Sequence, residues 1–251
     1  VVGVGTPGSV NKSNGNIEFS NNLKFDNVPA KAMLEERIGK TVFLDNDANC
    51  AALGEAIAGV GNGVENFVAI TLGTGVGSGI IVNGKIVVGV NYCAGEMGHM
   101  VISVDGKPCN CGRIGCWERY ASATALVNQT KAAMEANPDS LMWKLVDGDI
   151  TKVDGRIPFE AMKQGDAAGQ AVVDQYVKYL ACGLSNVINI FQPDILCVGG
   201  GVCNQGENLL TPVRKLIEEE RYSKYSVKQT KLCVAQLGND AGIVGAACLG
   251  R

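Results

Sequence analysis

Residues 95–118 gather the side chains of this sequence that are best suited to chemistry. The stretch holds the only histidine of the chain, and three cysteines follow it closely (His99, Cys109, Cys111 and Cys116). One imidazole and three thiolates are ligands that a tetrahedral zinc ion prefers, and together they leave no position open for water. The sequence therefore predicts a structural zinc site. The alternative is a buried histidine that lies near ordinary core cysteines.

Two acidic residues, Glu96 and Glu118, bracket this predicted metal loop. Ionised carboxylates are strong hydrogen-bond acceptors, so acids held beside a rigid loop could bind the hydroxyl groups of a polyol. The spacing alone leaves open that both are ordinary surface acids.

A second polar cluster occupies residues 45–49, where all but one position is Asp or Asn. A short β-branched strand at residues 41–44 precedes it, and an alanine-rich helix at residues 50–58 follows. Side chains at such a junction project into a cleft, next to the free N–H groups of the helix start. Capping the helix is the alternative role, but a cap needs only one residue. Asn46 and Asp47 are therefore candidate site residues.

Two glycine-rich segments could contact phosphates or a nucleotide. The first follows a strand at residues 65–72 and leads into another strand, so it fits neither the dinucleotide nor the Walker pattern (Gly73, Thr74, Gly75 and Gly77). Its exposed amides could hold phosphates, and a plain hairpin turn would explain it as well. The second lies between a buried strand and a helix, where it suits a ribose or phosphates (Gly199, Gly200 and Gly201). A tight turn for close packing is the alternative there.

The elements that must position these residues alternate between strands and helices. A first strand at residues 1–5 leads through a polar stretch around Asn14 to a helix at residues 29–38. Helical spacing of apolar residues then covers residues 119–137 and 166–190, and a strand at 231–237 precedes a closing helix at 241–249. This alternation predicts an α/β fold.

The composition is that of a globular protein, with 46% hydrophobic and 19% charged residues among 251. A formal net charge of −3, without a dense basic run, argues against nucleic acid or an anionic membrane as partner. No apolar run approaches the roughly 20 residues of a membrane helix. The other seven cysteines lie mostly in apolar contexts that suit free thiols in a reducing cytosol, so we expect a cytoplasmic protein.

Taken together, these motifs resemble the ROK family of sugar kinases and sugar-responsive repressors, over essentially the whole chain. The resemblance rests on the zinc loop, on residues 46–49 and 94–96, and on both glycine segments, which occur in the family's order. It implies a two-lobed actin-like ATPase (ribonuclease H-like) fold with a structural zinc loop. Residues 1–64 would be the remainder of the small lobe, residues 65–239 the large lobe, and residues 240–251 a closing helix.

The resemblance also implies a role for each candidate. Asp47 would be the general base that accepts the proton of the attacking sugar hydroxyl. The sugar would contact Gly8, Asn46, Asp47, Glu96, His99 and Glu118. The phosphates of ATP would face Gly73, Thr74, Gly75 and Gly77, and the adenosine would face Gly199, Gly200 and Gly201. Zinc would bind one ring nitrogen of His99 and leave the other for the sugar.

The implied activity is ATP- and magnesium-dependent phosphorylation of a hexose, with glucose as first candidate because residues 116–120 look most like those of bacterial glucokinases. A homodimer is common in the family. N-acetylhexosamine kinase and fructokinase are alternatives, as is a repressor if a DNA-binding segment precedes Val1. The Asp-x-Gly-Gly-Thr phosphate loop of family kinases does not occur in this sequence. We expect it upstream of Val1, since the first strand would otherwise lack sheet neighbours; if it is missing altogether, ATP and magnesium binding are in doubt.

Overall fold

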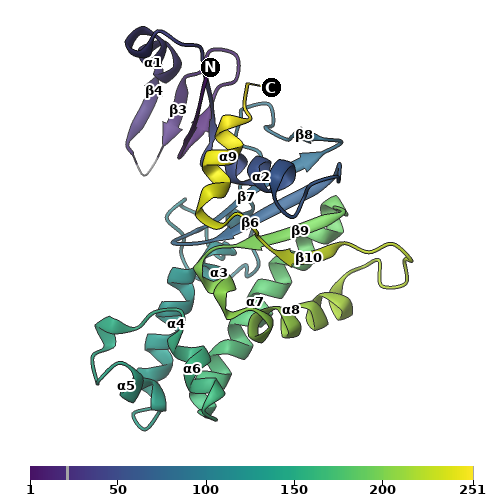
Figure 1. The fold of residues 1–251 in the computed structure, drawn as a ribbon. Helices are drawn as coiled ribbons and strands as arrows, with labels where there is room; N and C mark the ends of the chain where they lie inside the picture. The colour runs from purple at the N-terminus through teal and green to yellow at the C-terminus, as the bar shows by residue number, and fades with distance from the viewer. Residues whose placement is uncertain (21–22, 251) are drawn as a thin grey trace.

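The computed structural model describes residues 1–20 and 23–250. Its centre is a mixed five-stranded sheet in the order β10-β9-β6-β7-β8 (Figure 1). The strands are β6 (Phe67–Leu72), β7 (Val76–Val82), β8 (Lys85–Ile86), β9 (Ile195–Gly199) and β10 (Lys231–Val234). β6 and β7 form an antiparallel hairpin, while β9 runs parallel to both β6 and β10.

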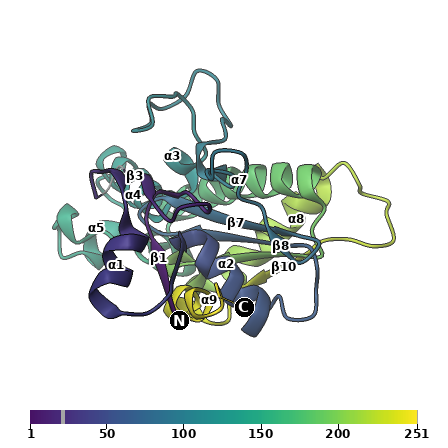
Figure 2. The same cartoon turned by 90° about the horizontal axis from the view of Figure 1, so that it is seen from above.

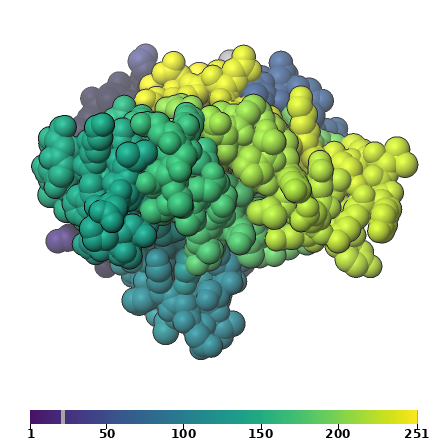
Figure 3. Space-filling view, turned by 90° about the horizontal axis from the view of Figure 1, so that it is seen from below, coloured from purple at the N-terminus to yellow at the C-terminus, as the bar shows by residue number. Residues whose placement is uncertain are grey.

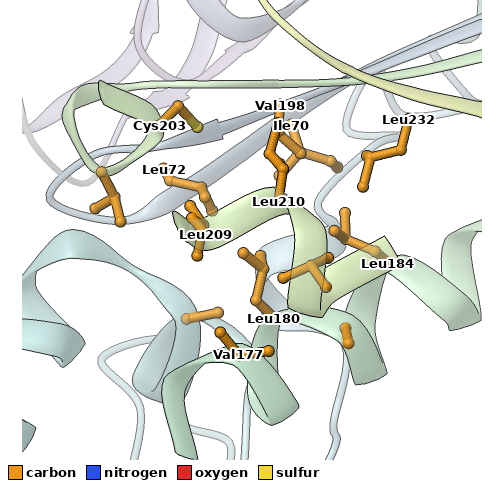
Figure 4. Close-up of a cluster of buried hydrophobic side chains, with 14 of the residues drawn as sticks. Ile70, Leu72, Val177, Leu180, Leu184, Val198, Cys203, Leu209, Leu210 and Leu232 are labelled. Atoms are coloured by element: carbon orange, nitrogen blue, oxygen red, sulfur yellow. The ribbon is translucent and has the colours of Figure 1, made fainter. Parts of the chain in front are cut away.

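Helices cover both faces of this sheet, which explains why its central strands are apolar at successive positions. Along β6, Val68, Ile70 and Leu72 belong to the larger hydrophobic cluster, while Phe67 and Ala69 point to the smaller cluster on the opposite face. Figure 4 shows the larger cluster, in which Leu180 and Leu184 of one helix and Leu209 and Leu210 of another face the sheet.

On that side α7 (Ala167–Phe191) and α8 (Glu207–Glu220) pack against the sheet. The other helices in this part of the chain are α3 (Glu118–Ala121), α4 (Ala123–Ala136), α5 (Leu141–Leu145) and α6 (Ile157–Lys163). Of these, α4, α5 and α6 share a hydrophobic cluster of their own and extend away from the sheet (Figure 1). The predicted long helix is confirmed in α7, and Asp166 caps it by accepting a hydrogen bond from the Gly169 N–H. The predicted single helix over residues 119–137 is wrong, because the extended backbone of Ser122 separates α3 from α4.

The N-terminal part carries two further sheets among the described residues. β1 (Val2–Thr6) pairs in parallel with β5 (Val42–Asn46), and β2 (Ser9–Val10), β3 (Ile17–Ser20) and β4 (Phe25–Val28) form an antiparallel sheet. Helix α1 (Ala30–Ile38) lies beside them (Figure 1). The sequence predicted only a polar connection where β2, β3 and β4 lie.

Helices α2 (Asp47–Ala58) and α9 (Ala241–Ala247) pack backbone against backbone on the other face. A Cβ atom on Gly245 would lie 1.7 Å from the Cys50 carbonyl oxygen, and one on Gly54 would lie 2.1 Å from the Ala241 carbonyl oxygen. The Glu55 carboxylate adds a further link by accepting a hydrogen bond of 2.6 Å from the Leu237 N–H. The closing helix is thus fixed to the helix that begins at Asp47, as Figure 2 shows from above.

The segment before α3 projects from the body of the molecule as a loop (Figures 2 and 3). Trp117 holds its end, since the indole is fully buried and donates a hydrogen bond of 2.9 Å to the Tyr179 carbonyl of α7. The predicted lobe boundaries at residues 64 and 239 stay a prediction. Among the described residues, no helix combines the length and the apolar character that crossing a membrane would require.

Candidate functional site

The four predicted metal ligands lie together in the segment that precedes α3. The ligand atoms of His99, Cys109, Cys111 and Cys116 all lie within 4.8 Å of one another. His99 Nδ1 is 3.7 Å from Cys109 Sγ, and Cys111 Sγ is 3.6 Å from Cys116 Sγ. Bonds of about 2.3 Å to sulfur and about 2.1 Å to nitrogen give tetrahedral edges of roughly 3.6–3.8 Å. The donor set therefore fits a zinc ion in both chemistry and spacing.

The loop has little regular structure to hold these ligands. Isolated bridges join Val101 to Cys116 and Pro108 to Ile114, and the Cys109 N–H donates to the Arg113 carbonyl. Burial raises the pKa of the Cys116 thiol to about 12. A backbone hydrogen bond from Arg113 lowers the pKa of the exposed Cys111 thiol. A bound cation would favour the thiolate at both positions.

Asp47 lies at the end of β5, in a turn held by side-chain hydrogen bonds. Asn46 caps α2, because its Oδ1 accepts hydrogen bonds from the backbone N–H groups of Ala48 and Asn49. Capping is therefore a real function of this cluster, and it falls to Asn46. Asp47 is the exposed first residue of the helix, with Oδ1 2.9 Å from the Ala48 nitrogen. Its carboxylate is thus available to a ligand.

An ion pair lies beneath this turn, and its carboxylate is buried while its lysine side chain reaches the surface. Asp45 is 3% exposed and pairs with Lys12, which also donates to the Leu44 carbonyl. The same carboxylate accepts hydrogen bonds from the Asn46 N–H at 2.7 Å and from Asn49 Nδ2 at 3.0 Å. These contacts fix the backbone on both sides of Asp47.

A small cavity of about 160 Å³ opens beside Asp47. It brings together four of the predicted sugar ligands, Gly8, Asn46, Asp47 and Glu96. Asn46 Nδ2 donates to the Gly8 carbonyl at 3.1 Å, which ties the first turn of the chain to the helix start. His99 and Glu118 are not among the residues that line this cavity.

A larger cavity of about 850 Å³ is also lined by Asp47. Its lining includes both predicted glycine segments, together with Asp47 and Glu118 (Gly73, Gly75, Gly77, Gly199, Gly200 and Gly201). Thr74 does not line it and instead lines a neighbouring cavity. Glu118 Oε2 accepts a hydrogen bond of 3.0 Å from the Val76 N–H, at the start of β7.

The glycines that line the large cavity fall into two kinds: those that the fold itself requires and those that it does not. Gly200 has φ +101°, and a Cβ atom there would lie 2.2 Å from the Leu72 carbonyl oxygen, so close packing explains it. A Cβ atom on Gly75 would lie 2.2 Å from Glu118 Oε2. Gly73 and Gly201 have no positive φ, and a Cβ atom on either would meet nothing within 4 Å. The fold does not require glycine at these two positions, whereas close approach of a ligand would.

Sequence reasoning missed several residues of both cavities. Asn49, Ser78 and Tyr92 line the small one, and Gly238, Asn239 and Gly242 line the large one. Asn239 carried a signal, because Asn239-Asp240 marks the start of the closing helix. Nothing in the sequence indicated that Lys12 would reach Asp45, since the contact depends on how the N-terminal strands fold.

Comparisons with known proteins all identify members of the ROK family. A model of the ROK family matches residues 1–251. The glucokinase of Thermotoga maritima is 39% identical over 249 residues, which cover 99% of this chain and 78% of that protein. The xylose repressor of Caldicellulosiruptor bescii is 31% identical over 97% of this chain and 60% of that protein. A ROK family glucokinase from Streptomyces griseus, solved in complex with glucose and AMPPNP, superposes with a TM-score of 0.86 at 37% identity, covering 98% of this chain and 80% of that one.

Proposed function

Because this chain belongs to the ROK family, we propose that it phosphorylates a hexose hydroxyl with MgATP as phosphoryl donor. Glucose is the first candidate substrate, with glucose 6-phosphate as product. The small cavity would hold the sugar, and the large cavity would hold the nucleotide.

The position of Asp47 carries this proposal. Asp47 lines both the small and the large cavity, so its carboxylate lies at the boundary between them. Phosphoryl transfer requires the attacking oxygen and the phosphorus to come within about 3–3.5 Å, and it gains most from positioning and charge stabilisation. A group at such a boundary can contact the acceptor while the donor approaches from the other side.

In this mechanism Asp47 accepts the proton of the sugar hydroxyl as the hydroxyl oxygen bonds to the γ-phosphorus. The bond from that phosphorus to the bridging oxygen breaks, and ADP leaves. Asn46 and the pair of Asp45 and Lys12 hold the Asp47 backbone, as their hydrogen bonds indicate. The backbone at Gly73 and Gly201 leaves room for the phosphates and the adenosine, respectively. Magnesium bound to ATP would neutralise phosphate charge.

The metal loop would hold the other side of the sugar. His99, Cys109, Cys111 and Cys116 would bind zinc, which would fix the fold of the loop and supply no reaction step. His99 Nδ1 faces Cys109, so the geometry leaves Nε2 for a sugar hydroxyl. Glu96 lines the small cavity and Glu118 the large one. Contacts of His99 and Glu118 with the sugar stay a prediction.

Two observations favour a kinase over a sugar-responsive repressor. A repressor needs a sugar site, but it has no use for a cavity of about 850 Å³ with two unobstructed glycines next to a carboxylate. The identity to the Thermotoga maritima glucokinase, 39%, also exceeds the 31% to the repressor. A kinase for N-acetylhexosamines or fructose uses the same chemistry and remains the second candidate.

A coupled ADP-release assay on the full-length gene product tests the proposal. Glucose, mannose, fructose and the N-acetylated hexosamines would each be supplied with MgATP. We expect turnover with glucose and a higher KM or lower kcat with the others. Binding of sugars without any ADP release would instead support the repressor.

A further inference from the structure

Glu55 is a buried carboxylate that has no role in the proposed reaction. It lies near the C-terminal end of α2 and is 2% exposed. Within residues 1–20 and 23–250 it makes no ion pair. Burial disfavours a charged group, and the C-terminal end of a helix disfavours a negative one. The fold keeps a carboxylate here against both effects, so its partners must compensate for both.

Two backbone N–H groups supply this compensation. Glu55 Oε1 accepts a hydrogen bond of 2.6 Å from the Leu237 N–H, and Oε2 accepts one of 3.2 Å from the Val60 N–H. A carboxylate offers an acceptor at each of its two ends, whereas a glutamine amide has an acceptor at one end and donors at the other. Glutamine would therefore satisfy one of these N–H groups and oppose the second.

The Leu237 N–H belongs to the turn that follows β10 and leads into α9. The Ala235 N–H still donates to the Val198 carbonyl of β9, at 2.8 Å. After Ala235 the chain leaves the sheet, and Gly238 adopts a positive φ of +55°. A single 3-10 turn, η4 (Gly238–Asp240), then leads directly into α9. Glu55 thus holds the middle of a turn that lies outside the sheet.

This turn forms part of the wall of the large cavity. Gly238 and Asn239, the two residues that follow Leu237, both line it. Glu55 itself does not line the cavity. Any effect of Glu55 on a ligand there passes through the backbone of the turn, which makes it a positioning residue and not a contact.

We propose that Glu55 positions the nucleotide, because it fixes the Leu237 N–H and so holds Asn239 where it contacts the ligand of the large cavity. This role rests on the proposed function, which assigns that cavity to the nucleotide. Glu55 and Leu237 are 182 residues apart in the sequence, and none of the sequence motifs singled out either of them.

Calorimetric titration with ADP and magnesium tests this role without requiring turnover. Glu55→Gln keeps the size of the side chain, and it should raise the ADP Kd by about tenfold because the turn is no longer held in place. The sugar affinity should stay the same, since Glu55 does not line the small cavity. Glu55→Ala removes both acceptors and should have a larger effect on ADP. If the alanine variant does not fold, the glutamine variant decides.

The same two substitutions at Glu35 are the matched controls. Glu35 also lies near the C-terminal end of a helix, α1, and its Oε1 accepts a hydrogen bond of 2.9 Å from the Val42 N–H. It lines neither the small nor the large cavity. We expect these controls to lower the free energy of unfolding and to leave the ADP Kd unchanged. The comparison therefore separates positioning from a general loss of stability.

A double-mutant cycle with Asn239→Ala tests the route. If Glu55 acts through the turn, Glu55→Gln should weaken ADP binding less in the Asn239→Ala background than in the wild type. Additive effects would overturn this role, as would an ADP affinity of Glu55→Gln equal to that of the wild type, and both results would leave the proposed function intact. Failure of the wild-type full-length gene product to bind ADP would overturn the proposed function as well.

Discussion

The two walls of the candidate site are built in different ways. The wall that carries Asp47 is a strand running into a helix, held by an N-cap and by the ion pair of Asp45 with Lys12. The wall that carries Glu96 leads into a projecting loop with isolated bridges and a cluster of four potential metal ligands, His99 among them. The first wall is held by the protein's own hydrogen bonds, whereas the second would owe much of its order to the proposed zinc ion. Substitutions at the two walls should therefore affect different properties of the protein.

The largest effect is expected at the first wall, from Asp47→Asn. The amide cannot accept the hydroxyl proton, so kcat should fall by about 10²–10⁴-fold. Sugar binding should persist, because the exposed side chain contributes little to the fold. Steady-state kinetics together with sugar titration check this. A variant with near wild-type turnover would exclude Asp47 as the base.

A smaller but broader effect is expected at the second wall, from Cys109→Ser. Loss of one thiolate should release the ion, which elemental analysis would detect. Without its anchor His99 would become mobile, and the sugar KM should rise by about 10–100-fold. Chelation of the wild type should have the same effect and should leave the Asp47 wall folded. Unchanged sugar affinity in a metal-free protein would show that the two walls are independent of the ion.

The ion pair beneath the first wall offers the complementary test. Lys12→Met leaves the Asp45 carboxylate buried without a cation. The cost should be about 2–3 kcal/mol in the free energy of unfolding, below the ~3–5 kcal/mol of a fully buried pair because the Lys12 side chain is 32% exposed. Denaturant unfolding measures it, and metal content should stay the same. A loss of zinc in this variant would contradict the separation of the two walls.

The smallest effect is expected from substitutions that compare two glycines of the large cavity, one required by the fold and one not. Gly201→Val should leave stability nearly unchanged, because a side chain there meets open space, and raise the nucleotide KM by roughly tenfold. Gly200→Ala is the matched variant, and it should destabilise the fold because of its positive φ and the nearby Leu72 carbonyl. Thermal unfolding and nucleotide kinetics distinguish them. An unaltered KM in Gly201→Val would place the nucleotide elsewhere.

Much of the fold was predictable because its signals are local. The alternation of buried strands and amphipathic helices indicated an α/β fold, and the actin-like ATPase fold of the ROK family is confirmed by the family match and the superposition. The helices predicted at residues 29–38 and 166–190 agree within one residue at each end with α1 and α7. Strands β2, β3 and β4 were missed, because residues such as Asn11 and Asn16 make the segment polar and its strands are short.

The candidate site was predictable only where its residues are close in sequence. The metal cluster lies within one loop, so spacing sufficed to bring its ligands together. The boundary position of Asp47 and the contact of Lys12 with Asp45 depend on how segments that are distant in the sequence pack together. Local sequence patterns do not predict such packing. The break at Ser122 was likewise hidden, because the apolar spacing continues across it.

The glycine contact between α2 and α9 has a mechanical consequence. No side chain lies between the two backbones at Gly54 and Gly245, so nothing compressible can absorb a displacement of one helix against the other. The turn that leads into α9 lines the large cavity, and α2 starts with Asp47. We therefore expect a nucleotide that displaces this turn to displace Asp47 by a similar amount. Binding in the large cavity would then change the position of the carboxylate in the small cavity.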